Sequence, residues 1–255
     1  MRRVNEVHGF EVAELAARIE LAAFYRVVHR HGLTDQIYNH ITLKLPGEEE
    51  AFLINPYGLR YDEVTASNLM KVNYAGEILF QAEPSHRLNF TGFVIHGAIH
   101  RARPDLHCVA HTHSEAGIAI SALEEGILPL SQSALRFTDN IGYHDFEGFA
   151  VDRDEEARLV ADLASADNLV LRNHGLVSCG RTVAQCCINL LQLELVARAQ
   201  LAVLATGRPI RLIGKAAIES AQSTLNALRS AGEDGAVEWQ AHLRWLADHS
   251  PDYRT

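Results

Sequence analysis

Two histidines, His111 and His113, lie one residue apart where the apolar run of VAHTHSEAG (residues 109–117) ends. In an extended strand residues i and i+2 project from the same face, so the two imidazoles would lie side by side. A third histidine, His174, interrupts the β-rich segment VLRNHGLVSCG just before Gly175. Three neutral imidazoles with a fourth position left open are the usual ligands of a catalytic zinc ion. The alternative is that they are ordinary polar residues at strand ends, because a chain with 14 histidines contains chance pairs.

A second histidine pair, His96 and His100, has i, i+4 spacing in a predicted helix, and this spacing also suits a metal site. The pair lacks the glutamate of an H-E-x-x-H motif, and Gly97 follows the first histidine. We therefore interpret these two side chains as helix packing or as contacts to the site, and not as metal ligands.

The segments that must position these histidines alternate between helical and strand patterns. Apolar spacing predicts helices over 11–32, 91–105, 114–123, 152–165 and 182–207, and strands over 40–45, 51–58, 69–80 (two short strands), 106–113 and 168–180 (interrupted). Ser114 is a good N-cap for the third helix, and the helix over 182–207 is apolar on most sides, as expected of a buried helix. This mixture predicts an α/β or α+β fold, arranged as a three-layer sandwich.

Composition indicates a globular protein with one main domain. The chain has 255 residues, 47% hydrophobic and 22% charged, and a net charge of −9. Lysine and arginine form no cluster beyond Arg2-Arg3, and no apolar run approaches the ~20 residues of a membrane span, so we expect neither a nucleic-acid nor a membrane partner. The four cysteines lack metal-ligand spacing and are interpreted as buried thiols in a reducing cytoplasm: Cys108, Cys179, Cys186 and Cys187.

The composition changes after Pro209, which suggests a division of the chain. Residues 1–209 form the predicted main domain. Residues 210–255 form a predicted C-terminal extension with helices near 216–229 and 235–249. We expect this extension to pack on the main domain or on a neighbouring subunit.

The histidine segments carry a family resemblance. GAIHRARPDLHCVAHTHSEAGIAIS followed by NLVLRNHGLVSCGRTVAQCC resembles the class II aldolase/adducin family. YNHITLKLP and LINPYGLRYDEVTASNLMKVN are similar to two further family segments, and the resemblance covers roughly residues 10–207. LPLSQSALRF and YHDFEGFAVD resemble the adducin-head branch and its bacterial relatives.

The resemblance implies an αβα sandwich around a mostly antiparallel sheet, and a zinc ion or another divalent transition metal. His111, His113 and His174 match the family's metal-binding histidines one by one. The resemblance also implies a homotetramer with active sites between subunits and a small-molecule substrate.

The chain departs from the sugar-phosphate aldolases of this family at three positions. Gly92 stands where they carry a glutamate that serves as base and as fourth metal ligand in the resting site. Gln132 stands where they carry a tyrosine acid, and a glutamine donates no proton as an acid at neutral pH. Tyr57-Gly58 replaces a Thr-Gly phosphate-binding pair, which leaves Gly58 and Asn39 as the matching substrate-binding positions.

Other residues would then have to move the proton, and Glu115, Tyr143 and His144 are the candidates. Glu115 is better explained as a first-turn acid that suits a helix dipole, and Tyr143 and His144 are equally well explained as a surface pair at a strand end. Two hypotheses follow. The first is a metal-dependent lyase, epimerase or decarboxylase that acts on a hydroxy-carbonyl or sugar-type compound. The second is a non-catalytic metal-binding or assembly module like the adducin head, but without the long basic tail of the adducins.

Overall fold

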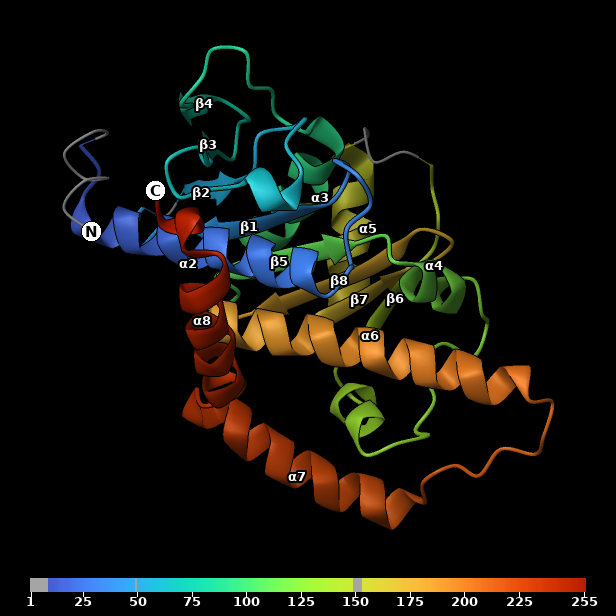
Figure 1. Ribbon diagram of the computed structural model, residues 1–255. Coiled ribbons are helices and arrows are strands. Elements are labelled where there is room, and N and C mark those ends of the chain that lie inside the picture. The colour runs from blue at the N-terminus through green and yellow to red at the C-terminus, as the bar shows by residue number, and fades with distance from the viewer. Residues whose placement is uncertain (1–8, 49, 149–152) are drawn as a thin grey trace.

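A computed structural model describes residues 9–48, 50–148 and 153–255 and contains one eight-stranded sheet (Figure 1). Its strands run in the order β4-β3-β2-β1-β5-β8-β7-β6. The strand bounds are β1 (His40–Lys44), β2 (Ala51–Ile54), β3 (Met70–Asn73), β4 (Ile78–Phe80), β5 (Cys108–Thr112), β6 (Gly142–His144), β7 (Asn168–Leu171) and β8 (Gly175–Gly180). Neighbouring strands are antiparallel except β6 and β7, which confirms a mostly antiparallel sheet.

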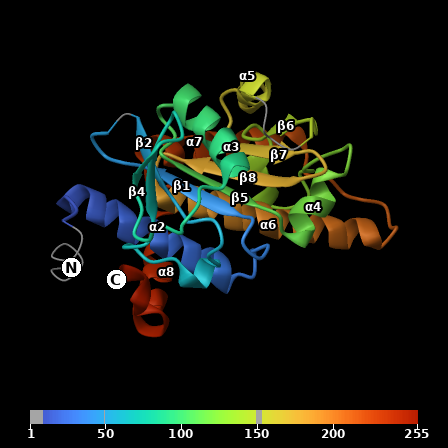
Figure 2. The ribbon, with the colours of Figure 1, turned by 90° about the horizontal axis from the view of Figure 1, so that it is seen from above.

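Helices cover both faces of this sheet (Figure 2). On one face lie α2 (Val12–Arg30), α4 (Glu115–Ser121), α6 (Val183–Ala205) and α8 (Ala236–His249). On the other lie α3 (Phe90–Ala102) and α5 (Arg153–Leu163). The expected three-layer α/β sandwich is confirmed.

The alternation of side chains along β5 decides which layer each residue meets. Cys108 and Ala110 pack in the core with α2 and α6, whereas Val109 packs in the core with α3 and α5. His111 has the parity of Val109 and therefore faces α3. In β1, Ile41 joins the core under α2, so its neighbours His40 and Thr42 face α3 as well.

The predicted elements form with small shifts at their ends. Ser114 is the N-cap of α4, and its Oγ accepts a hydrogen bond from Gly117 N–H at 2.9 Å. The strand predicted over 51–58 ends at Ile54, shortly before Pro56, which has no N–H to donate. The last main-domain helix, α6, is buried on several sides as expected.

Among the described residues, α6 alone is long and apolar enough to span a membrane, and half of its most apolar window is buried. Its buried polar side chains bond to the sheet and loops: Asn189 Nδ2 donates to Cys179 O at 3.0 Å, and Gln200 Nε2 donates to Gly126 O at 2.7 Å. These contacts identify α6 as a core helix of the sandwich.

The C-terminal residues pack on the same chain. After α7 (Lys215–Ala231), which buries none of its residues, α8 buries Trp239 and Leu246 in the core beneath α2. The Trp239 ring meets the Phe24 ring edge to face at 6.2 Å. Figure 1 shows α7 and α8 wrapping one side of the sandwich.

Candidate metal centre

The ends of two neighbouring strands bring the three histidines together. His111 and His113 lie at the end of β5, and His174 lies in the turn from β7 to the adjacent β8. Asn173 adopts a left-handed φ of 56° in this turn. A Cβ at Gly175 would lie 2.3 Å from Thr112 O, so a residue without a side chain is required for β8 to approach β5 here.

The Nε2 atoms of the three rings converge. His111 and His113 are separated by 2.7 Å, His113 and His174 by 3.0 Å, and His111 and His174 by 3.3 Å, measured between Nε2 atoms. Zinc–nitrogen bonds of about 2.0–2.1 Å in a tetrahedron place ligand atoms roughly 3.3–3.4 Å apart. The triad is therefore close to the spacing of a metal-binding set.

The outer nitrogens determine what the converging atoms can do. His111 Nδ1–H donates to Leu176 O at 2.9 Å, and His113 Nδ1–H donates to the Asp35 carboxylate at 3.1 Å. In neutral rings this leaves a lone pair on each Nε2, and the two Nε2 atoms lie 2.7 Å apart. Lone pairs at that separation repel each other unless a cation lies between them, so the donor set fits a divalent transition metal.

Burial keeps two of the three rings, His111 and His174, in the protonation state that a metal needs. It lowers the pKa of His111 well below its ordinary value, with further lowering by the neighbouring His113 and His174 rings. Burial and His113 lower the pKa of His174 to about 4. Neutral imidazole is the metal-binding form, so both rings are available to a metal at neutral pH.

A second group of buried histidines adjoins the triad. His96 Nε2 lies 2.9 Å from His40 Nδ1, and Thr42 Oγ1 lies 2.7 Å from His96 Nδ1 and 2.8 Å from His100 Nε2. Burial lowers the pKa of His40 and His96 well below the ordinary value and that of His100 to about 3. Of the two α3 histidines, His96 thus contacts a third buried histidine, His40, which sequence reasoning missed, whereas His100 contacts Thr42.

His40 is next to the triad because of strand register. It pairs with His111 across β1 and β5, and the two ring centroids are 5.2 Å apart. A Cβ at Gly92 would lie 2.3 Å from His40 Cδ2 and 2.4 Å from its Nε2. In this chain, the His40 ring therefore occupies the space beside α3 that a side chain at position 92 would enter.

The loop before β1 supplies two further polar groups. The Asp35 N–H donates to Asn39 Oδ1, and the Asp35 carboxylate holds His113. Asn39 is 2% exposed, and its Nδ2 has no hydrogen-bond partner within the part of the chain that the structure describes. Asn39 thus offers a buried N–H donor next to Asp35, the residue that holds His113. Sequence reasoning did not identify this role of Asp35.

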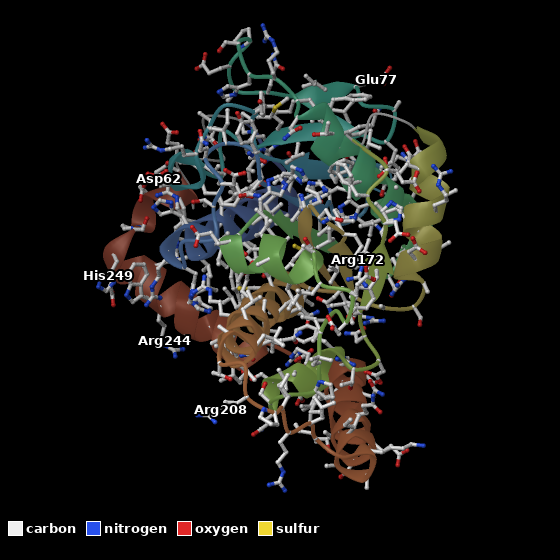
Figure 3. The ribbon with its side chains drawn as sticks, turned by 90° about the vertical axis from the view of Figure 1, so that its right-hand side faces the viewer. Asp62, Glu77, Arg172, Arg208, Arg244 and His249 are labelled. Atoms are coloured by element: carbon white, nitrogen blue, oxygen red, sulfur yellow. The ribbon has the colours of Figure 1, made fainter. Side chains whose placement is uncertain are left out.

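The three sequence candidates for proton transfer differ in their surroundings. Glu115 is solvent-exposed in the first turn of α4. Tyr143 OH accepts a hydrogen bond from Ile127 N–H at 2.9 Å, and the labelled Arg172 of Figure 3 lies over the Tyr143 ring at 4.5 Å. His144 is buried, with Nδ1 2.8 Å from Asp162, and it lines a small cavity with His174.

Two positions named by the resemblance are on the surface. Gly58 is exposed, with a left-handed φ of 108°. Gln132 is exposed at the start of the short 3-10 helix η2 (Ser133–Phe137). Within this one chain, neither is gathered with the histidines.

Residues 19–201 match the model of the class II aldolase and adducin N-terminal domain. A Caulobacter vibrioides protein named "Putative aldolase class 2 protein" is 42% identical over 242 residues, which cover 94% of this chain and 93% of that protein. Mouse alpha-adducin is 38% identical over 259 residues, which cover 95% of this chain but 35% of the adducin. The crystal structure of an aldolase II superfamily protein from Pseudomonas syringae superposes with a TM-score of 0.90 at 39% identity, covering 97% of this chain and 98% of that one.

Proposed function

Because the chain belongs to the family of class II aldolase and adducin N-terminal domains, we propose that it is a metal-dependent enzyme for a small hydroxy-carbonyl or sugar-type substrate. His111, His113 and His174 would hold zinc or another divalent transition metal. When bound, this ion would supply Lewis-acid polarisation of a carbonyl oxygen or an enediolate. The convergence of two Nε2 lone pairs, fixed by Leu176 O and Asp35, is the observation that carries the proposal.

The chain's own residues would orient the substrate. Asn39 Nδ2 is a buried donor that finds no partner in residues 9–48, 50–148 and 153–255, and a substrate oxygen would satisfy it. Gly92 supplies no carboxylate, so a different group must move the proton. Glu115, Tyr143 and His144 remain our candidates, and His144 is favoured because it shares a cavity wall with His174.

We also propose that the chain works as a cytoplasmic homotetramer. Exposed apolar side chains on α6 and along the segment that follows it support burial against another subunit, among them Leu195 at 52% and Leu212 at 50% exposed. Light scattering on the purified protein would measure the mass of the assembly.

The second candidate function is a metal-binding or assembly module without catalysis. Gly92 and Gln132 favour it, because neither can act as an acid or a base, and the match to alpha-adducin agrees with it. A screen of hydroxy-carbonyl compounds with metal-loaded protein separates the two functions, since only the enzyme turns over a compound.

Metal content per chain is the direct test of the centre. Elemental mass spectrometry of tag-free protein should find about one transition metal per chain, lost in a His111→Ala/His113→Ala double variant. The double variant His29→Ala/His107→Ala, which removes two exposed histidines, should keep the metal. No metal in the unmodified protein, even after incubation with zinc, would overturn the proposal.

A further inference from the structure

A cavity of about 1070 Å³ lies at the end of the sheet away from the histidine triad, and no triad residue belongs to its wall. The wall includes Lys44 at the end of β1 and Arg181 just before α6. His40, which pairs with His111, lies four residues before Lys44 in β1, roughly 14 Å away in an extended strand. Ligand cavities commonly have volumes of about 300–1,000 Å³. This cavity is therefore a separate space, large enough for a small organic molecule.

The ends of three neighbouring strands set Lys44 and Arg181 on either side of His107. Lys44 N–H donates to His107 O at 2.8 Å, and His107 N–H donates to Gly180 O at 2.9 Å. Arg181 directly follows Gly180 at the end of β8. Neighbouring strands are about 4.8 Å apart, so Lys44 and Arg181 lie roughly 10 Å apart across β1, β5 and β8.

The side chains of Lys44 and Arg181 reach the same part of the wall. Lys44 has the parity of Thr42 in β1 and therefore faces α3. Its Nζ donates to Arg103 O, directly after α3, at 3.1 Å. Arg181 donates to the carboxylate of Asp105, two residues further along the same loop, at 3.1 Å. The two cationic groups thus both lie beside the loop between α3 and β5.

Lys44 lacks a counter-charge in this arrangement. Among the described residues it forms no ion pair, and its ammonium group donates to a backbone carbonyl. Asp105 is already shared by Arg103 at 2.8 Å and Arg181 at 3.1 Å. Burial lowers the pKa of Lys44, and Asp105 offsets this effect only in part. A half-buried cation without a paired carboxylate would be stabilised by an anion in the cavity.

The rest of the wall is apolar or acidic and comes from other elements. Its acidic side chains belong to α2 and to the turn between β1 and β2: Glu20, Glu48 and Glu50. Glu48 is held by Lys71 at 2.7 Å. Three alanines of α2 and two residues after β1 form the apolar part: Ala13, Ala16, Ala17, Leu45 and Pro46. The cavity therefore combines a basic side near α3 with an apolar side along α2.

We propose that this cavity is a second ligand site, in which Lys44 and Arg181 bind the phosphate or carboxylate group of a small organic anion. The apolar side along α2 would contact the body of that molecule. Arg181 can do this while paired with Asp105, because a guanidinium group has five N–H donors. The site shares no residue with the triad, so the inference does not rest on the proposed metal-dependent activity.

The test uses phenyl phosphate, benzoate and phenol, which share one aromatic ring and differ in charge. Isothermal titration calorimetry with protein prepared without added metal gives a Kd for each compound. We expect one or both anions to bind at least about tenfold more tightly than phenol, as charge-assisted hydrogen bonds allow. The anion with the lower Kd shows whether phosphate or carboxylate is the preferred group.

Variants then assign the preference to the basic side of the cavity. In Lys44→Gln/Arg181→Gln the anions should bind within roughly twofold of phenol. Lys44→Gln alone keeps the ion pair of Arg181 with Asp105 and should still weaken anion binding several-fold, so it tests the inference even where the double variant fails to fold. Arg208→Gln/Lys215→Gln removes the same charge from exposed residues and is the matched control, which should bind like the unmodified protein.

A third double variant, His111→Ala/His113→Ala, separates this site from the triad and should bind the anions normally. Loss of anion binding in it would place the anion at the triad and overturn the inference. Equal affinity of the unmodified protein for the anions and phenol would also overturn it. So would full anion binding in Lys44→Gln, or equal weakening in Arg208→Gln/Lys215→Gln, which would indicate a general effect of net charge.

Discussion

At the residue scale, the hydrogen bond from His113 to Asp35 fixes both the tautomer and the orientation of a metal ligand. Carboxylates in this position typically change metal affinity 10- to 100-fold when they are removed. We therefore expect Asp35→Asn to weaken zinc binding by about this factor while the fold survives, measured by competition with a chromophoric chelator. Asp248→Asn, at an exposed residue of α8, should leave the affinity unchanged. Equal affinities in the two variants would refute the role of Asp35.

Gly92 shows how one missing side chain shapes the site. Replacing a helical glycine by alanine ordinarily stabilises a protein by about 1 kcal/mol, but overpacking costs about 1–3 kcal/mol. Because a Cβ at Gly92 would collide with the buried His40 ring, we expect Gly92→Ala to destabilise the protein in urea unfolding. Gly97→Ala in the same helix meets only ordinary contacts and should be neutral or stabilising.

A double-mutant cycle checks the cause of that destabilisation. Removal of the ring in His40→Ala opens the space that the new methyl group needs. The cost of Gly92→Ala should therefore shrink in the His40→Ala background. An unchanged cost would mean that the clash lies elsewhere in α3.

At the element scale, Glu194 of α6 forms hydrogen bonds with the end of β5, where His111 and His113 lie. Its carboxylate accepts hydrogen bonds from Ser114 Oγ at 2.6 Å and from Thr112 Oγ1 at 3.1 Å, the two residues that flank His113. Burial raises the pKa of Glu194 above its ordinary 4.5. The folded state therefore holds this proton more tightly than the unfolded state does, and the resulting stability is complete below 4.5 and lost as the pH rises through the folded-state pKa.

The raised pKa of Glu194 in the folded state determines how its contribution to stability changes with pH. We expect the stability of metal-free protein, relative to a Glu194→Gln variant, to fall as the pH rises from mildly acidic to neutral. Urea unfolding of both proteins at several pH values measures the difference. For Glu125→Gln, at an exposed glutamate, the stability of the unmodified protein relative to the variant should not fall as the pH rises. A Glu194→Gln difference that grows with pH would contradict the assigned effect of burial.

The elements were predictable because their signals are local, and the arrangement between them was not. Apolar periodicity and the Ser114 cap predict α4 and its neighbours within a few residues of their ends. The spacing of His111 and His113 likewise predicts their common face. The contact of His40 with His111 depends on the pairing of β1 with β5, about 70 residues apart, and no local pattern encodes that register. Asp35 was equally hidden, because it acts from a loop in which Gln36 has a left-handed φ of 46°.

At the scale of the whole molecule, the C-terminal residues complete the core of the sandwich. Asp234, just before α8, forms a bidentate ion pair with Arg136 of η2, with N–O distances of 2.7 and 2.8 Å. Asp252, after α8, bonds to Arg26 of α2 at 2.9 Å. Contacts on both sides of α8 tie it to the main domain, and we propose that residues 210–255 are part of the folding unit and not a detachable appendage.

Trp239 tests this proposal, because its side chain is 4% exposed and packs on Phe24 of the same chain. Truncation of a buried tryptophan to alanine typically costs about 3–5 kcal/mol. We expect Trp239→Ala to lose stability on this scale in urea unfolding, whereas Val237→Ala, 79% exposed in the same helix, should stay within about 0.5 kcal/mol. Packing within one chain makes the loss independent of protein concentration. A loss that disappears at high concentration would instead place the main contacts of α8 on a neighbouring subunit.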